Sequence, residues 1–325
     1  MIGVYVPGGS AQQFIDSIKL AEAKGVPSFW LTSGGLLPDV ITVMAAAAMQ
    51  TARIRMGTSI TQTWPRHPVA IASQCIAMAQ LAPGRFRIGL GPSHQPAVEG
   101  MYGVKYEKPL LNLREYLYTV QSILKQGEVE FSGTFVKTTA KLGQGPGNYR
   151  IEAPVDVPVM ASALRPASFS LCGELADGAI SWVCPWEYLR DTALPAMREG
   201  AAKAGRAVPP LVAHVPVVLT DDVETAHAAA GPALARYANL TNYRGMFEIA
   251  GFHDAAGGDL NALIDAVAVY GTDETVAARL GQIMSEGAGE IIAHPMPVGS
   301  EDVAGQTEHF LEVVARANKL AGVAV

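Results

Sequence analysis

Eight short apolar segments recur along the whole chain, and a stretch with helical periodicity follows each of them. The segments are almost continuously apolar instead of alternating between apolar and polar residues. Continuous apolar strands are typical of a parallel sheet that is covered on both faces. The expected strands are residues 2–6, 29–32, 54–60, 86–90, 157–161, 178–184, 211–219 and 291–295.

Repeated strand–helix units predict an α/β fold, and eight of them predict a (β/α)8 TIM barrel. A doubly wound open sheet is the alternative. A chain of 325 residues can hold two average domains or one large barrel. Because no break in composition divides the chain, we expect one TIM-barrel domain over residues 1–325, with insertions after strands 4 and 7. The second insertion, over residues 239–268, is expected to be irregular and partly helical.

Residues with capping preferences mark the beginnings of several expected helices. Ser10 and Gln13 predict a capping box, and Pro68 after His67 occupies a first helical position. Asp221 and Glu224 predict another capping box after the seventh strand.

Composition excludes several classes of protein. Apolar residues make up 49% of the chain and charged residues 17%, which excludes an intrinsically disordered chain. The net charge of −6, with no basic patch, argues against a nucleic-acid partner. No segment is long and apolar enough to cross a membrane, and the N-terminus lacks the features of a secretory signal. Because Cys75, Cys172 and Cys184 are too widely spaced for a disulfide framework or a zinc site, we expect a cytoplasmic protein.

In a (β/α)8 barrel the chemistry takes place at the C-terminal ends of the strands. This rule selects residues 32–35, 59–62, 91–95, 162–165, 182–186 and 294–297. Metal-binding patterns such as H-x-H and H-E-x-x-H are absent from the sequence, so no metal site is expected.

The turn after the fourth strand reads Gly-Leu-Gly-Pro-Ser-His over residues 89–94. Pro92 and the missing third glycine make it a poor dinucleotide fingerprint. A glycine-rich turn at this place lets a planar ligand approach the backbone closely, although a tight turn without a ligand would look the same. A lone histidine is more often structural than catalytic, but His94 lies at a strand end, where it can exchange a proton near neutral pH.

Tryptophans follow two of the strands. Trp30, inside the second strand, is expected in the core. Trp64, Trp182 and Trp186 follow the third and sixth strands and are predicted to line a pocket beside a flat cofactor. Simple packing at the rim of the barrel is the alternative for these three side chains.

Two segments, residues 56–68 and 85–95, resemble the bacterial luciferase-like superfamily. Residues 99–103, 114–116 and 270–280 extend the resemblance over essentially the whole chain. The branch of oxidoreductases that use the deazaflavin coenzyme F420 is the most similar, and the FMN-using monooxygenases are near relatives.

The resemblance implies a TIM barrel that holds a flavin or deazaflavin ring at the C-terminal ends of its strands. It implies a cis peptide bond at Ser59-Ile60, with Ile60 pressing on the ring, and a homodimer formed through the second and third helices. Backbone N–H groups at the helix that begins at Pro166, together with Arg165, would meet an anionic part of the cofactor. The implied cofactor contacts are Ser59, Ile60, Thr61, Gln62, Ser93, Gln95, Ser162, Ala163, Leu164 and Arg165.

Three positions depart from the pattern of the resembled F420 dehydrogenases. Their Asp-His pair after the second strand is replaced by Ser33-Gly34, which places Ser33 in the expected substrate pocket. Their glutamate in the turn after strand four is replaced by His94, and their glycine pair after strand five by Leu164-Arg165. Oxidation of a sugar phosphate or a simple alcohol is therefore not implied for this chain.

The expected reaction is hydride transfer between coenzyme F420 and an unidentified organic substrate. In such a reaction the cofactor supplies the hydride chemistry, and the protein positions the cofactor and supplies a proton relay. His94 is the expected proton relay, with Gln95 or Gln62 as hydrogen-bonding support. An FMN-dependent luciferase-like monooxygenase is the first alternative, and a non-catalytic flavin-binding protein is the second.

Overall fold

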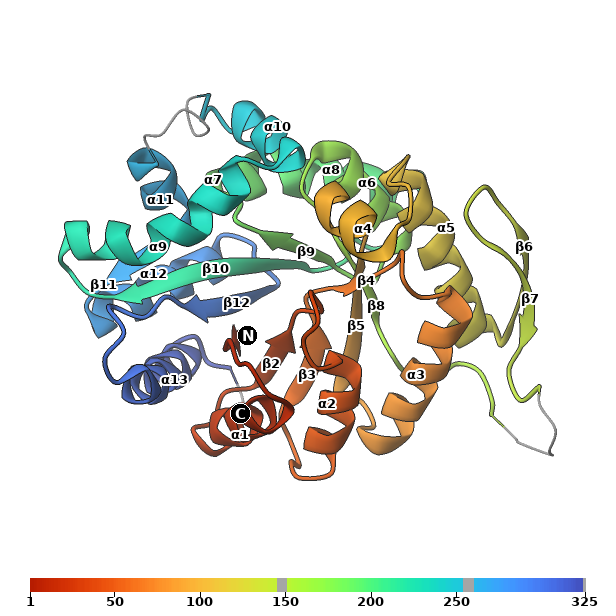
Figure 1. Cartoon of the computed structure of the whole chain (residues 1–325), viewed down its shortest axis with the longest axis horizontal. Helices are drawn as coiled ribbons and strands as arrows, with labels where there is room; N and C mark the ends of the chain where they lie inside the picture. The colour runs from red at the N-terminus through yellow and green to blue at the C-terminus, as the bar shows by residue number, and fades with distance from the viewer. Residues whose placement is uncertain (145–150, 254–259, 324–325) are drawn as a thin grey trace.

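The computed structural model describes residues 1–144, 151–253 and 260–323. In this part of the chain, eight parallel strands close into a barrel with helices around it (Figure 1), because β10 pairs with β9 and β12 pairs with β1. The TIM barrel is confirmed, and the open sheet is excluded. The barrel strands, in order, are β1 (Ile2–Tyr5), β2 (Ser28–Leu31), β3 (Arg55–Thr58), β5 (Phe86–Gly91), β8 (Val159–Ser162), β9 (Ala179–Trp182), β10 (Leu211–Leu219) and β12 (Glu290–Pro295).

The outer layer consists of helices that follow the strands along the chain. They are α1 (Ala11–Ala23), α2 (Val40–Ala48), α3 (Pro68–Leu81), α5 (Pro109–Gln121), η1 (Ser122–Gln126), α6 (Pro166–Leu175), α7 (Trp186–Tyr188), η2 (Leu189–Ala193), α8 (Leu194–Lys203), α9 (Val223–Ala238), α12 (Asp273–Ser285) and α13 (Val303–Leu320). The capping box of Ser10 and Gln13 is confirmed. The capping box at Asp221 is wrong: Asp222 caps α9, since its carboxylate accepts the N–H of Thr225.

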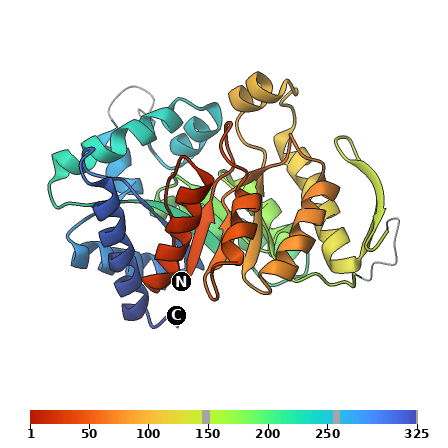
Figure 2. The same cartoon turned by 60° about the horizontal axis from the view of Figure 1, so that its bottom comes forward.

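Several elements were not expected from the sequence. The third strand ends at Thr58, and the short β4 (Thr61–Gln62) follows and pairs with β5. Helix α4 (Gln95–Tyr102) follows β5. The sequence does predict a short strand and turn over residues 129–135, and the structure has there a hairpin of β6 (Glu128–Ser132) and β7 (Lys137–Lys141), which projects from the barrel in both views (Figures 1 and 2). The short β11 (Val269–Gly271) pairs with the end of β10.

The predicted insertion over residues 239–268 is partly helical, as expected. It contains α10 (Thr241–Ile249) and α11 (Asn261–Val267), and residues 254–259 lie outside the described part of the chain. In Figure 2, α4 and α10 lie at one end of the barrel and both chain termini at the other. Both insertions therefore cover the C-terminal ends of the strands.

The interior of the barrel has its own small core. Trp30, Met160, Ile180, Val212 and Ile292 form this inner core, against which Tyr5 and Ile60 also pack. Trp30 is buried, as the sequence predicts. A larger apolar layer lies between the barrel and the helices.

A buried ion pair closes the N-terminal end of the barrel beneath the inner core. Arg87 forms a two-point contact with the carboxylate of Glu290, which also accepts hydrogen bonds from Ser28 Oγ and Trp30 Nε1. Burial opposes ionisation of Glu290, but the Arg87 guanidinium and these donors hold the pKa of its carboxyl below the usual value.

Two further findings concern the cysteines and the possibility of a membrane-spanning helix. All three cysteines are free and buried. None of the helices in residues 1–144, 151–253 and 260–323 is long and apolar enough to cross a membrane.

Candidate active site

A second layer of side chains lies directly above the inner core, toward the C-terminal ends of the strands. Successive side chains of a strand point to opposite faces, so residues two apart point the same way. Trp182, His214 and His294 each follow an inner-core residue, Ile180, Val212 and Ile292, by two positions. Their side chains therefore point into the barrel as well.

These three rings and Tyr5 form a continuous group, called here the ring cluster. The ring centroids of Trp182 lie 4.3 Å from those of His214 and 5.1 Å from those of His294. The two imidazoles are 5.4 Å apart, and Tyr5 lies 4.4 Å from His294. The ring cluster thus spans the four consecutive strands β9, β10, β12 and β1 on one side of the barrel.

Both histidines of the ring cluster are uncharged near neutral pH. Burial lowers the pKa of His214 well below the usual value, and the neighbouring His294 lowers it further. Burial also lowers the pKa of His294 to about 3. Three buried polar atoms in the cluster have no hydrogen-bond partner among the described residues: His214 Nε2, His294 Nδ1 and Trp182 Nε1.

Ile60 lies across the barrel from the ring cluster, above a glycine. A Cβ added at Gly91 would stand 2.9 Å from Ile60 Cγ1 and would overlap Ser162 Oγ, so only glycine leaves this space. The peptide bond Ser59-Ile60 is cis, as the family resemblance predicts. Thr32 Oγ1 donates a hydrogen bond of 2.7 Å to Ser59 O, and Ser33 N donates one of 3.0 Å to Ile60 O.

Gln62 connects the end of β4 to the turn after β5. Its Nε2 donates to Ser93 Oγ at 3.0 Å, and its Oε1 accepts a 2.7 Å hydrogen bond from the hydroxyl of Tyr102. Trp64 Nε1 donates to Pro92 O at 2.9 Å, and Tyr106 OH donates to Ser93 O at 3.0 Å. The structure therefore brings together Gln62, Trp64 and Ser93, and adds Tyr102 and Tyr106, which were not among the predicted site residues.

His94 comes immediately before α4, and its ring lies next to Tyr243 of the second insertion. Its ring is 5.8 Å from Tyr243 and 6.2 Å from Tyr237. Tyr237 also lies 5.6 Å from Trp182, so one tyrosine ring connects His94 to the ring cluster. Burial and the positive charge of Arg236 lower the pKa of His94, which keeps this imidazole neutral as well.

The segment after β8, next to the expected anion site, has some of its backbone donors already paired. Ser168 Oγ accepts hydrogen bonds from the backbone N–H groups of Leu164 and Arg165, so these donors already have partners within the chain. The Arg165 side chain is exposed and runs beside Gly245 of α10. Ser162 is half-buried and points the same way as Met160 of the inner core, whereas Ala163 is buried in the outer layer.

Two predicted site residues lie away from this group. The indole N–H of Trp186 donates to Glu286, the residue that ends α12, and its ring is buried in the outer layer. Gln95 is exposed, and its amide donates to Glu99 at 3.2 Å. Neither side chain contacts the ring cluster or Ile60. Ser33 and Thr61 each have a buried hydroxyl oxygen without a hydrogen-bond partner among the described residues.

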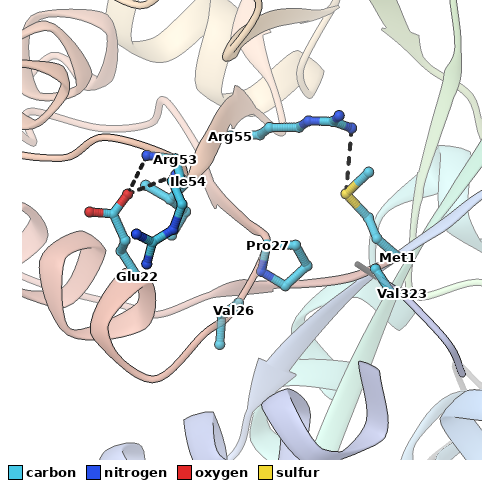
Figure 3. Close-up of a pocket in the computed structure, with 8 residues that line it drawn as sticks. All are labelled: Met1, Glu22, Val26, Pro27, Arg53, Ile54, Arg55 and Val323. Atoms are coloured by element: carbon cyan, nitrogen blue, oxygen red, sulfur yellow. Dashed lines mark hydrogen bonds between the residues drawn. The ribbon is translucent and has the colours of Figure 1, made fainter. Parts of the chain in front are cut away.

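A separate pocket of about 200 Å³ lies at the opposite end of the barrel (Figure 3). Its lining residues Met1, Pro27 and Ile54 come immediately before β1, β2 and β3. This pocket is therefore at the N-terminal ends of the strands, away from the ring cluster.

The residues at the C-terminal end fit a planar cofactor. Ile60 is half-buried and held in place above Gly91, which provides an apolar surface for one face of a flat ring. In the described residues, no group of three or more His, Cys, Asp or Glu side chains could hold a metal ion.

Comparison with known proteins gives one consistent relationship. A family model described as luciferase-like monooxygenase matches residues 3–289. The chain is 27% identical over 316 residues to 5,10-methylenetetrahydromethanopterin reductase from Methanolobus tindarius, which covers 91% of this chain and 93% of that protein.

Two solved structures are similar in fold. The coenzyme F420-dependent tetrahydromethanopterin reductase from Methanopyrus kandleri has a TM-score of 0.71 and 23% identity, and the match covers 97% of each chain. The oxygenating constituent of 3,6-diketocamphane monooxygenase from Pseudomonas putida, in complex with FMN, has a TM-score of 0.71 and 18% identity. That match covers 100% of this chain and 99% of the other.

Proposed function

The chain belongs to the luciferase-like monooxygenase family, and from this premise we propose that it is an oxidoreductase that uses coenzyme F420. It transfers a hydride between the deazaflavin ring and a small, uncharged or weakly polar organic substrate. Similarity to a methylenetetrahydromethanopterin reductase over nearly the full length of both chains, together with the likeness in fold to the coenzyme F420-dependent reductase from Methanopyrus kandleri, supports the choice of F420.

The arrangement of Ile60 above Gly91 is the observation on which the proposal depends. It provides an apolar surface at the C-terminal end of the barrel, opposite the ring cluster. A flat ring on Ile60 would have its other face toward Trp182, His214 and His294, where a substrate can lie. The bound deazaflavin supplies the hydride chemistry, and the protein supplies position and proton transfer.

The surrounding residues have separate tasks in this arrangement. Gln62, through Ser93 and Tyr102, keeps the turn after β5 in a fixed position beside Ile60. His94 is neutral and can accept or pass on a proton at its imidazole. Arg165, exposed and without an ion-pair partner among the described residues, can contact the anionic tail of the cofactor.

Titration of the purified protein with F420 and, separately, with FMN tests the choice of cofactor. We expect F420 fluorescence to change with saturation at micromolar concentration, and FMN to bind at least tenfold more weakly. Tighter binding of FMN than of F420 would contradict the proposal.

The alternative, an FMN-dependent monooxygenase, is supported by the similarity in fold to an FMN complex. Consumption of oxygen by the protein with reduced FMN and a candidate substrate would favour this alternative. A homodimer through α2 and α3, which the family resemblance implies, stays a prediction, and light scattering during gel filtration measures it.

A further inference from the structure

The ring cluster has more unpaired hydrogen-bonding capacity than a packed interior normally has. Buried polar atoms nearly always have a partner, and leaving one without costs about 1–3 kcal/mol. Three such atoms, Trp182 Nε1, His214 Nε2 and His294 Nδ1, belong to rings that are in contact with one another. Their concentration in one place indicates a ligand that provides the missing partners.

The chemistry of these atoms restricts that ligand. The indole N–H of Trp182 can only donate, so its partner has to be an acceptor. A neutral imidazole has one donor and one acceptor nitrogen. Each histidine can therefore bind the ligand atom that accepts from Trp182, or a polar atom of the ligand next to it. Carbonyl oxygens and imine nitrogens have the required acceptor character.

The electrostatics of the ring cluster restrict the ligand further. Burial lowers the pKa of both histidines, and the neighbouring His294 also lowers the pKa of His214. No carboxylate or cation of the described residues contributes to either pKa. Of the rings in contact with them, Tyr5 is neutral because burial raises the pKa of its hydroxyl, and the indole of Trp182 has no ionisable group. An ionised carboxylate or phosphate would lose its hydration here without gaining a counter-charge.

We propose that the substrate of this enzyme is uncharged at its reacting end, and that Trp182, His214 and His294 bind a carbonyl oxygen or imine nitrogen beside the reacting carbon. This inference rests on the proposed function, because the ring cluster faces the position that the deazaflavin ring takes on Ile60. Trp182 is thus a substrate-binding residue, whereas Trp186, the second tryptophan after the sixth expected strand, has a structural contact with Glu286.

A matched pair of substitutions tests the proposal. Trp182→Phe keeps an aromatic ring but removes the unpartnered N–H together with part of the indole, and Trp186→Phe makes the same change of side chain in the outer layer, where the N–H is bonded to Glu286. Three probes that share a benzene ring separate the chemical classes: acetophenone has a neutral acceptor, benzoate has a charge, and ethylbenzene has neither. Binding is measured by ¹H–¹⁵N spectra of the tryptophan indoles and histidine rings, for the protein alone and for the protein with F420.

We expect acetophenone to shift the signals of Trp182 and of both cluster histidines, and to bind at least tenfold more tightly than benzoate or ethylbenzene. Trp182→Phe should weaken acetophenone binding about tenfold, and Trp186→Phe should not change it. Equal affinity for benzoate, no acetophenone binding, or an unchanged affinity in Trp182→Phe would overturn the proposal. If Trp182→Phe fails to fold, the proposal is tested by the unsubstituted protein alone, in which acetophenone has to shift the signals of Trp182 and of both cluster histidines. Failure of F420 to bind would overturn the proposed function separately, since the spectra without F420 still report on the ring cluster.

Discussion

Ile60 packs directly over Gly91, with its Cγ1 where a side chain at position 91 would have to be. The contact joins the cis peptide after β3 to the inner face of β5, two features that lie 31 residues apart. The position of the proposed ring surface therefore depends on a residue that touches no ligand itself.

Gly91→Ala should weaken F420 binding at least tenfold. The added methyl group would lie 2.9 Å from Ile60 Cγ1, so Ile60 has to move toward the ring position. Fluorescence titration measures the effect. Gly281→Ala is the matched control, because nothing lies within 4 Å of an added Cβ in the interior of α12. The control should bind F420 normally, and an unchanged affinity in Gly91→Ala would count against the proposed ring surface.

Gln62→Leu should loosen the turn after β5. The substitution removes hydrogen bonds to Ser93 and Tyr102, and we expect a loss of about 1–3 kcal/mol in the free energy of unfolding, together with weaker F420 binding. Urea denaturation and F420 titration measure the two effects. Gln95→Leu, at an exposed position, should change neither, and equal effects in both variants would show that Gln62 does not position the turn.

The protein should lose stability in acid because of its neutral buried histidines. The folded-state pKa of His294, about 3, is below the unfolded value of about 6.5. The contribution of the neutral ring to the free energy of unfolding is therefore fully present above pH 6.5 and is lost as the pH falls toward 3. At pH 5 the loss from one such histidine is about 2 kcal/mol. Denaturation curves at pH 7 and pH 5 should show a smaller difference for His294→Asn than for the unsubstituted protein. An equal difference would mean that His294 is charged in the folded state at pH 5.

Arg87→Met should be strongly destabilising. The substitution leaves the carboxylate of Glu290 buried without its cation, and breaking a buried pair in this way costs about 3–5 kcal/mol. Urea denaturation at pH 7 measures the loss. Lys203→Met, which breaks an exposed pair with Glu199, is the control and should leave the unfolding curve unchanged. A stable Arg87→Met protein would show that Glu290 is protonated or hydrated in the fold.

Apolar strand-length segments were sufficient to predict the barrel, since every expected strand has a counterpart in it. The family resemblance also led to the cis peptide bond at Ser59-Ile60. Gln62, Ser93 and Trp64 were each predicted as site residues, and the hydrogen bonds that group them were not foreseen. Helix α4 was missed because its sequence, which begins at Gln95-Pro96, follows a glycine-rich turn with little apolar periodicity.

Of the histidines of the ring cluster, His214 was missed, whereas His294 lay inside the selected residues 294–297 without being singled out as a site residue. In strands that are apolar on both faces, alternation does not show which side chains point inward. His214 lies inside the expected strand 211–219, and His294 lies near the end of the expected strand 291–295. The signal that the two share is a polar ring within an otherwise apolar strand. Trp186 was misleading in the opposite way, because it follows the expected strand but its ring is buried in the outer layer, where its N–H donates to Glu286.

A crystal structure of the protein with F420 bound tests the central claim most directly. We predict that the deazaflavin ring lies with one face on Ile60 and the other toward Trp182, His214 and His294. A ring bound elsewhere, for example in the pocket lined by Met1 and Arg55 at the opposite end of the barrel, would contradict the account.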